Sequence, residues 1–187
     1  MSAPSRQWLL YQEYAAYLAA LDIVGFSKRL GDPQALLATR TGLIRAVEQT
    51  AFFQASLEQS VVWAHFLGDE LRLAFRADAA DARQVREFVE NIVLNLSSSY
   101  QADSNRRASV VAVVLSGYMM AKEWRGCKYL HGVIAHKAQR WMNTKILSPG
   151  EIAVDSNFHS TETGLGAKWR KVEFGQDVGW VSLVAPE

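Results

Sequence analysis

Apolar positions along the chain follow two kinds of spacing, and together they predict a mixed α+β fold. Short, nearly continuous apolar runs are typical of buried strands, and they predict strands over residues 17–23, 60–65, 71–76, 108–117, 152–154, 168–174 and 179–184. Apolar residues three and four positions apart are typical of amphipathic helices, and they predict helices over residues 32–50, 78–96 and 132–143. The first of these helices has a clear start, because Asp32 can cap free backbone amides and Pro33 suits the first turn.

The order of these elements narrows the fold. A strand, a helix, a hairpin, a helix and a strand, followed by a helix and further strands, predict a ferredoxin-like α+β sandwich. In it, helices cover one face of a mostly antiparallel sheet. No internal repeat, low-complexity tract or linker interrupts residues 1–187, so we expect one domain with its core at about 17–184.

Composition and charge exclude several classes of function. The net charge is +1, so bulk electrostatics favour neither a nucleic-acid nor a membrane partner. The single cysteine, Cys127, excludes an intramolecular disulfide and a cysteine-based zinc cluster. The sequence contains no run of 18 apolar residues and no basic N-terminal region followed by a long apolar one, so we expect a cytoplasmic protein.

Two acidic residues stand at the ends of apolar segments. Asp22 closes the first predicted strand, and Asp69 lies in the turn of the predicted hairpin. If that strand lies beside the hairpin, the two carboxylates converge at one end of the sheet. Paired carboxylates are ligands for Mg²⁺ or Mn²⁺, and two such ions can clamp a triphosphate. Taken alone, each residue fits a structural role better than a ligand role, Asp22 as a cap and Asp69 as a turn residue.

A glycine-containing turn follows Asp22. The segment Val24-Gly25-Phe26-Ser27 connects a predicted strand to a predicted helix. Free backbone amides in such turns can hold phosphate oxygens. The sequence therefore predicts a phosphate-binding turn next to the carboxylate pair.

Three motifs in order resemble class III nucleotidyl cyclases. Residues 22–27 resemble that family's first metal motif, Asp-Ile/Val-x-Gly-Phe-Ser/Thr, and residues 66–69 are similar to its second, an apolar-Gly-Asp hairpin. Residues 132–140 resemble its helix motif, in which Asn follows Gly by four residues and Arg follows by eight. Gly132 and Arg140 match, whereas His136 replaces the asparagine. Residues 150–154 look like the family's strand after this helix, and the resemblance runs from about residue 17 to 183.

The resemblance implies two divalent ions, Mn²⁺ or Mg²⁺, and a role for each matching residue. Asp22 and Asp69 would bind the metals, with the carbonyl of Ile23 as an added ligand. Arg140 would stabilise charge on the phosphates while the ribose 3′-oxygen attacks the α-phosphorus, a task that suits the planar guanidinium. His136 would either donate a hydrogen bond in place of asparagine or mark altered geometry, and both alternatives stay open.

The resemblance also implies which residues would bind the triphosphate. The backbone of Gly25, Phe26 and Ser27 would hold the β- and γ-phosphates. Lys171 is a further candidate near the final strands, although the family's usual Lys-Gly motif there is replaced by Phe174-Gly175.

In the family's composite sites, the metal residues and the arginine helix come from different protomers. A chain that carries both halves is therefore expected to form a symmetric head-to-tail homodimer with two sites.

The two positions that select the base in this family carry neither the residues typical of adenylyl cyclases nor those typical of guanylyl cyclases. His65 stands four residues before Asp69, where the family often has Lys or Glu, and Tyr129 stands three before Gly132, where it often has Asp. With the short length, these departures resemble the Pycsar antiphage cyclases, which make cyclic UMP or cyclic CMP for a separate effector protein. The resemblance favours UTP as substrate. Cytidylate cyclase, purine cyclase and a catalytically silent domain that dimerises or senses nucleotide are the alternatives.

Overall fold

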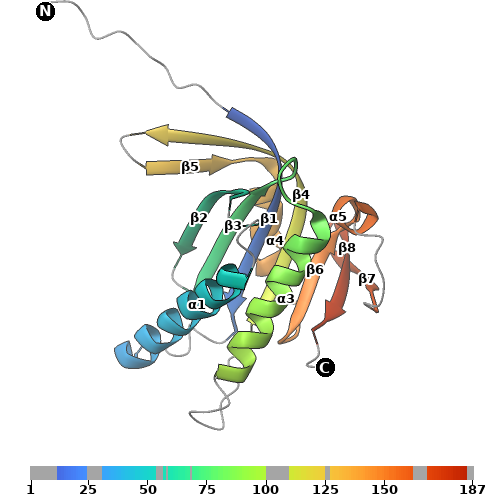
Figure 1. Ribbon diagram of the computed structural model, residues 1–187. Helices are drawn as coiled ribbons and strands as arrows, with labels where there is room; N and C mark the ends of the chain where they lie inside the picture. Colours follow the sequence, from blue (N-terminus) through green and yellow to red (C-terminus); the bar gives the residue numbers. More distant parts are fainter. Residues whose placement is uncertain are drawn as a thin grey trace, which may run out of the picture.

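The computed structural model describes residues 12–24, 31–53, 57, 59–67, 69–99, 110–124, 127–161 and 168–184. One sheet contains every strand of these segments, in the order β2-β3-β1-β4-β6-β8-β7, with β5 paired to the outer part of β4 (Figure 1). The strands are β1 (Gln12–Ile23), β2 (Val61–Leu67), β3 (Glu70–Arg76), β4 (Val110–Trp124), β5 (Cys127–His131), β6 (Glu151–Asp155), β7 (Arg170–Phe174) and β8 (Asp177–Leu183). The helices are α1 (Pro33–Phe53), α3 (Ala82–Ser99), α4 (Val133–Asn143) and α5 (Ser156–Thr161).

β1 is an interior strand of the sheet, with antiparallel neighbours β3 and β4 on its two sides. Its odd-numbered residues, such as Leu21, join one hydrophobic cluster, and its even-numbered residues, such as Leu18, join another. Because both faces of β1 are buried, the strand reads as a continuous apolar run and not as an alternating one. The β4–β6 pair is parallel, so the sheet is mostly but not wholly antiparallel.

Helices cover both faces of the sheet. α1 and α3 lie on the face of the odd-numbered β1 residues, where Leu43 and Ile92 enter the core (Figure 1). α4 lies on the opposite face, with Ile134, Ala138 and Trp141 buried against even-numbered β1 residues. The mixed α+β class predicted from the sequence is confirmed, but the expectation that all helices share one face was wrong for α4. The spacing of apolar residues shows that a helix buries one side, not which face of the sheet it covers.

The boundaries of several elements differ from the prediction. β1 begins at Gln12 and β4 continues to Trp124, since their outer halves pair with each other beyond the helix-covered core. β5 and α5 were not predicted. α3 begins at Ala82, because Asp81 is the cap, its carboxylate accepting the Arg83 N–H at 2.7 Å. Within the described ranges, no helix is long and apolar enough to cross a membrane.

Candidate active site

Asp22 lies at the end of β1 between two neighbouring strands. In the register of the sheet it is opposite Glu70 of β3 and Val111 of β4. Its even number places it on the face that α4 covers, since Leu18 and Ala20 point into the cluster beneath that helix. The strand pairing on both sides fixes the backbone that carries this carboxylate.

The carboxyl group of Asp69 lies close enough to that of Asp22 to raise its pKa. Burial is the main cause that raises the pKa of Asp22, and the charges of Asp69 and Glu70 raise it further, to about 6. The backbone N–H of Ile23 donates to Asp22 and partly offsets this. Like charges held together in a desolvated position favour a shared proton or a bound cation. The convergence of the two acids expected from the sequence is thus present.

A third acid beside the pair is bound by an arginine. Arg72 of β3 donates to both carboxylate oxygens of Glu70, at 2.6 and 3.0 Å, and also donates to Gln139 of α4. Both side chains of the Arg72–Glu70 pair are 12% exposed. The alternation Glu70-Leu71-Arg72-Leu73 signals that Glu70 and Arg72 share a face, but the contact with Gln139 has no signal in the sequence.

The donor set of the pair fits a hard divalent cation. Carboxylate oxygens are the preferred ligands of Mg²⁺ and Mn²⁺, and Mg²⁺ is often held by one or two carboxylates, with phosphates and water filling the other positions. A cation beside Asp22 and Asp69 would offset the repulsion that raises the pKa of Asp22. In the parts of the chain that the structure describes, no group of three or more potential ligands forms a complete metal cage.

Some predicted phosphate ligands cannot be compared with the structure. Gly25, Phe26 and Ser27 lie outside the described residues. Ile23 lies within them, as a buried strand residue opposite Val110.

Gly132 allows α4 to begin directly against β4. A Cβ atom at this position would lie 2.8 Å from the carbonyl oxygen of Tyr118 and 3.2 Å from the Cα of Met119. Both neighbours are backbone atoms that cannot turn away, so the close approach needs glycine. This contact gives the motif glycine a structural reason, because it sets where the helix carrying His136 and Arg140 starts.

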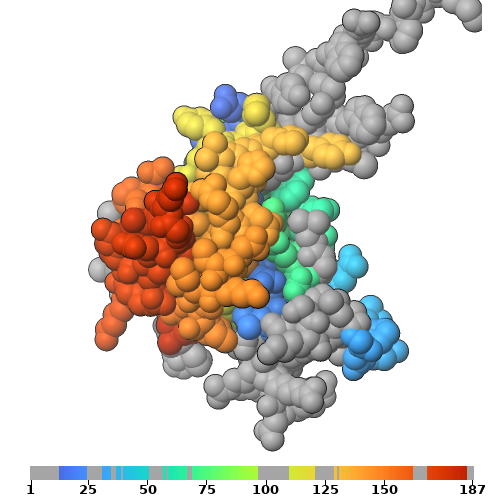
Figure 2. Space-filling view, turned by 180° about the vertical axis from the view of Figure 1, so that it is seen from behind, coloured from blue at the N-terminus to red at the C-terminus, as the bar shows by residue number. Residues whose placement is uncertain are grey.

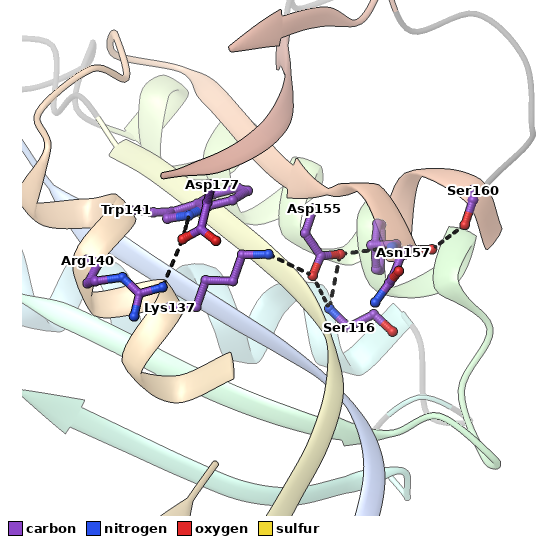
Figure 3. Close-up of polar contacts among 9 residues, drawn as sticks. Ser116, Lys137, Arg140, Trp141, Asp155, Asn157, Ser160 and Asp177 are labelled. Atoms are coloured by element: carbon purple, nitrogen blue, oxygen red, sulfur yellow. Dashed lines mark hydrogen bonds and ion pairs between the residues drawn. The ribbon is translucent and has the colours of Figure 1, made fainter. Parts of the chain in front are cut away.

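The side chains of His136 and Arg140 are both exposed on α4, one turn apart. The Arg140 guanidinium donates from Nη2 to Oδ2 of Asp177, the first residue of β8, at 2.8 Å (Figure 3). Asp177 stands 37 residues from Arg140, and no feature of the sequence pairs them.

Within one protomer, Arg140 is far from the acid pair. Through the strand register, Asp22 is level with Val111 and then with Leu183, at the end of β8. Asp177, which binds Arg140, stands at the beginning of β8. Three strand spacings and the length of β8 separate Asp177 from Asp22 by roughly 25 Å along the sheet. While it is bound to Asp177, Arg140 of one protomer is therefore too far from Asp22 to contact the same phosphate.

The predicted base-reading residues lie in two places. His65 is exposed on β2 at the edge of the sheet, opposite Arg72, with its ring centroid 5.4 Å from that of Trp63. Tyr129 is 42% exposed on β5, opposite Lys122. The structure does not bring these two residues together within one protomer.

Lys171 lies apart from the other predicted residues. It stands on the edge strand β7 opposite Trp180, which packs in the cluster beneath α1 and α3. Directly opposed residues of a strand pair share a face, so Lys171 points away from the face of α4 and Arg140. Its neighbour Arg170 faces the α4 side, where it donates to Glu151 at 2.7 Å.

No protein family and no curated protein matches the chain in sequence. Solved structures do match it in fold. The adenylyl cyclase CyaB from P. aeruginosa is 14% identical with a TM-score of 0.71, covering 96% of this chain and 98% of its own. The guanylate cyclase domain of RhGC from Catenaria anguillulae, in complex with GTP, is 15% identical with a TM-score of 0.69, covering 92% and 98%.

The guanylyl cyclase domain of the RhoGC fusion protein from the aquatic fungus Blastocladiella emersonii, in a dimeric form, is also similar. It is 15% identical with a TM-score of 0.73, and the match covers 94% of this chain and 97% of that domain. Adenylyl and guanylyl cyclases are thus both among the similar structures. The chain has the α+β fold of the class III nucleotidyl cyclase catalytic domain.

Proposed function

We propose that this chain is a metal-dependent nucleotide cyclase. The observation that carries the proposal is the proximity of the Asp22 and Asp69 carboxylates at the end of β1. It occurs in a fold shared with nucleotide cyclases. A half-buried pair of like charges destabilises the folded chain, which favours a ligand site over a structural contact.

The proposed reaction is an internal displacement at phosphorus. The ribose 3′-hydroxyl gives its proton to solvent and its oxygen forms a bond to the α-phosphorus, while the bond to the bridging oxygen breaks and pyrophosphate leaves with the electron pair. Two divalent ions, when bound, would supply charge neutralisation on the phosphates. Asp22 and Asp69 would hold those ions in place. Arg140 would donate N–H groups to phosphate oxygens as negative charge develops, and its guanidinium stays charged throughout.

A complete site in this proposal needs two copies of the chain. Because roughly 25 Å along the sheet separates Asp177, where Arg140 is bound, from Asp22, the arginine in this proposal comes from a partner. Exposed large apolar side chains lie along the β4–β5 hairpin and the start of α4, as expected of a contact surface. They are Tyr118, Met120, Tyr129 and Val133. A head-to-tail homodimer with two composite sites accounts for both features.

For the substrate we propose UTP, with cyclic UMP as a signal to a separate effector protein in antiphage defence. The support is the sequence resemblance, in which His65 and Tyr129 replace the residues typical of purine cyclases. Their exposure is compatible with contact to a base held between two protomers. CTP and the purine nucleotides are the alternatives that the assay must separate.

Turnover of four nucleotides tests the proposal. Purified full chain with Mn²⁺ is incubated separately with UTP, CTP, ATP and GTP, and the products are resolved by chromatography. We expect a 3′,5′-cyclic product and an equal amount of pyrophosphate with UTP. A cyclic product from another nucleotide would correct the substrate. No consumption of any nucleotide, with Mn²⁺ or with Mg²⁺, would contradict the enzyme itself.

His136 favours a second candidate, a silent cyclase-like domain that binds nucleotide without converting it. Imidazole replaces the expected amide one turn before Arg140. Calorimetric binding of UTP with Ca²⁺, in a chain that shows no turnover with Mn²⁺, would identify this case.

A further inference from the structure

The arginine proposed to act on the phosphates is tied to a rigid frame. Oδ2 of Asp177 accepts one hydrogen bond from Arg140 at 2.8 Å and another from Nε1 of Trp141 at 3.2 Å. Figure 3 shows Asp177 between the two side chains, which follow each other on α4. The bond to Arg140 is the main cause that lowers the pKa of Asp177, so this carboxylate stays charged.

Trp141 is the fixed part of this frame. Its ring is fully buried and stacks on Phe174 of β7, with centroids 4.1 Å apart and planes 5° apart. A Cβ atom at Gly179 of β8 would lie 2.4 Å from the same ring, so the hairpin of β7 and β8 rests directly on it. The indole N–H is thereby fixed, and it orients the carboxylate of Asp177.

A second acid holds the adjacent turn of α4. Nζ of Lys137 lies 3.6 Å from Oδ2 of Asp155 and 4.9 Å from the centre of the Trp141 ring (Figure 3). Asp155 is itself buried, and it accepts the Phe158 N–H at 2.8 Å. Acids of β6 and β8 thus contact consecutive basic positions of α4, and the helix has little freedom to rotate. Seen from behind, α4 lies between the red C-terminal strands and the green β2–β3 hairpin (Figure 2).

We propose that Asp177 is a positioning residue for Arg140, which it directs toward the nucleotide phosphates before substrate binds. This inference rests on the proposed cyclase function and adds a residue to it. Asp177 is not among the residues proposed above to bind the metal ions, the phosphates or the base.

The geometry of the ion pair favours a role in which Asp177 orients the Arg140 guanidinium over one in which it holds the guanidinium away from the substrate. The contact uses Nη2, one of the two terminal nitrogens, and leaves 61% of the Arg140 side chain exposed. An exposed ion pair is weak, so it cannot hold the guanidinium away from a triphosphate. It can narrow the rotamers of a long side chain, which lowers the entropy lost when the phosphate contacts form.

Substitution of Asp177, with kcat and KM measured separately, tests this role. The full chain is assayed with Mn²⁺ and the nucleotide that the wild type converts. We expect Asp177→Ala to lower kcat about tenfold while KM stays within about twofold, because orientation acts on the transition state. Asp177→Asn keeps an acceptor for both donors and should stay within about threefold of wild-type kcat. Asp78→Ala removes an exposed arginine–aspartate pair at the end of β3 and should leave kcat unchanged.

The outcomes separate this inference from the proposed function. An inactive wild type contradicts both. An active wild type with unchanged or increased kcat in Asp177→Ala overturns the positioning role alone. The ¹H–¹⁵N signal of the Trp141 indole and the melting temperature report whether the frame survives. Where Asp177→Ala loses the fold, Asp177→Leu, which also lacks an acceptor but fills more of the space, decides, and a kcat equal to that of the wild type then overturns the proposal.

Discussion

At the scale of single residues, the carboxylates of Asp22 and Asp69 lie close together, and their repulsion lowers the stability of the folded chain. The pKa of Asp22 rises to about 6 because of burial and because Asp69 and Glu70 lie near it. Glu70 is bound by Arg72, whereas Asp22 and Asp69 meet each other. The acid pair thus carries a repulsion that a cation would relieve, and this repulsion can be measured without any assay of activity.

Asp22→Asn should stabilise the metal-free protein at neutral pH. A raised pKa means that the folded state binds the proton of Asp22 more tightly than the unfolded state. The wild type therefore loses stability as the pH rises from the ordinary value of 3.8 through about 6. Asparagine cannot ionise, so the variant avoids this loss. We expect a gain of about 1–2 kcal/mol in the free energy of unfolding, after allowance for solvent screening.

Urea unfolding in the presence of a chelator measures this difference. The gain should shrink as the pH falls and be absent below the unfolded-state pKa, where the wild-type Asp22 is protonated in both states. A gain of the same size at acidic and neutral pH would show that charge is not its cause.

Asp69→Asn should abolish both turnover and the stabilisation by metal. A cation that binds the folded state raises the melting temperature, and removal of a ligand carboxylate removes that rise. Differential scanning fluorimetry with and without Mn²⁺ gives the readout. Glu48→Gln, an exposed acid on α1, is the matched control and should behave as the wild type. An Mn²⁺-induced rise that persists in Asp69→Asn would contradict the metal assignment.

At the scale of elements, the contact between α4 and the C-terminal hairpin depends on a glycine. A methyl group at Gly179 would lie 2.4 and 2.6 Å from two carbons of the Trp141 ring and 3.0 Å from Phe174. The stacked rings leave no direction in which to move. We expect Gly179→Ala to reduce stability by about 1–3 kcal/mol, as overpacking does.

Chemical denaturation of Gly179→Ala beside Gly31→Ala gives the comparison. A Cβ atom at Gly31 would meet nothing within 4 Å, so that change should stay within about 0.5 kcal/mol of the wild type. Equal effects at the two positions would mean that the hairpin can move away from α4.

The sequence predicted elements well where one physical cause dominates. Buried strands such as β1 appear as apolar runs, and α1 begins where Asp32 accepts the backbone N–H of Gln34 at 3.0 Å. β5 escaped prediction because it pairs with the outer half of β4, outside the core, and so has no clear apolar pattern. The face that α4 covers also escaped, since periodicity within a helix carries no information on its neighbours.

In the candidate site, too, one contact was predicted from the sequence and another was not. The meeting of Asp22 and Asp69 was predicted, because a strand end and a hairpin turn are local features joined by one strand pairing. The bond from Arg140 to Asp177 was not, because it joins residues 37 apart through side chains alone. Pairings of that kind depend on packing that no spacing rule encodes.

At the scale of the whole molecule, two copies should complete each other. Asp69→Asn lacks the acid half of the site, and Arg140→Ala lacks the arginine half. Each should be inactive alone. In an equal mixture, half of the dimers contain both variants and one intact site of two, so about a quarter of wild-type activity should return. A mixture that stays inactive after subunit exchange would contradict the composite site.

The place of β1 within the sheet also determines when the site can form. Its partner strands both follow it along the chain, and Gln12 and Ile23 pair with Ala121 and Val110. Contacts so distant along the chain slow folding, because the chain loses much entropy before the contacts form. During synthesis, one edge and part of each apolar face of β1 would stay uncovered until β4 leaves the ribosome. The strand that carries Asp22 is therefore made before both of its partner strands, and it is secured on both sides only once β4 is complete.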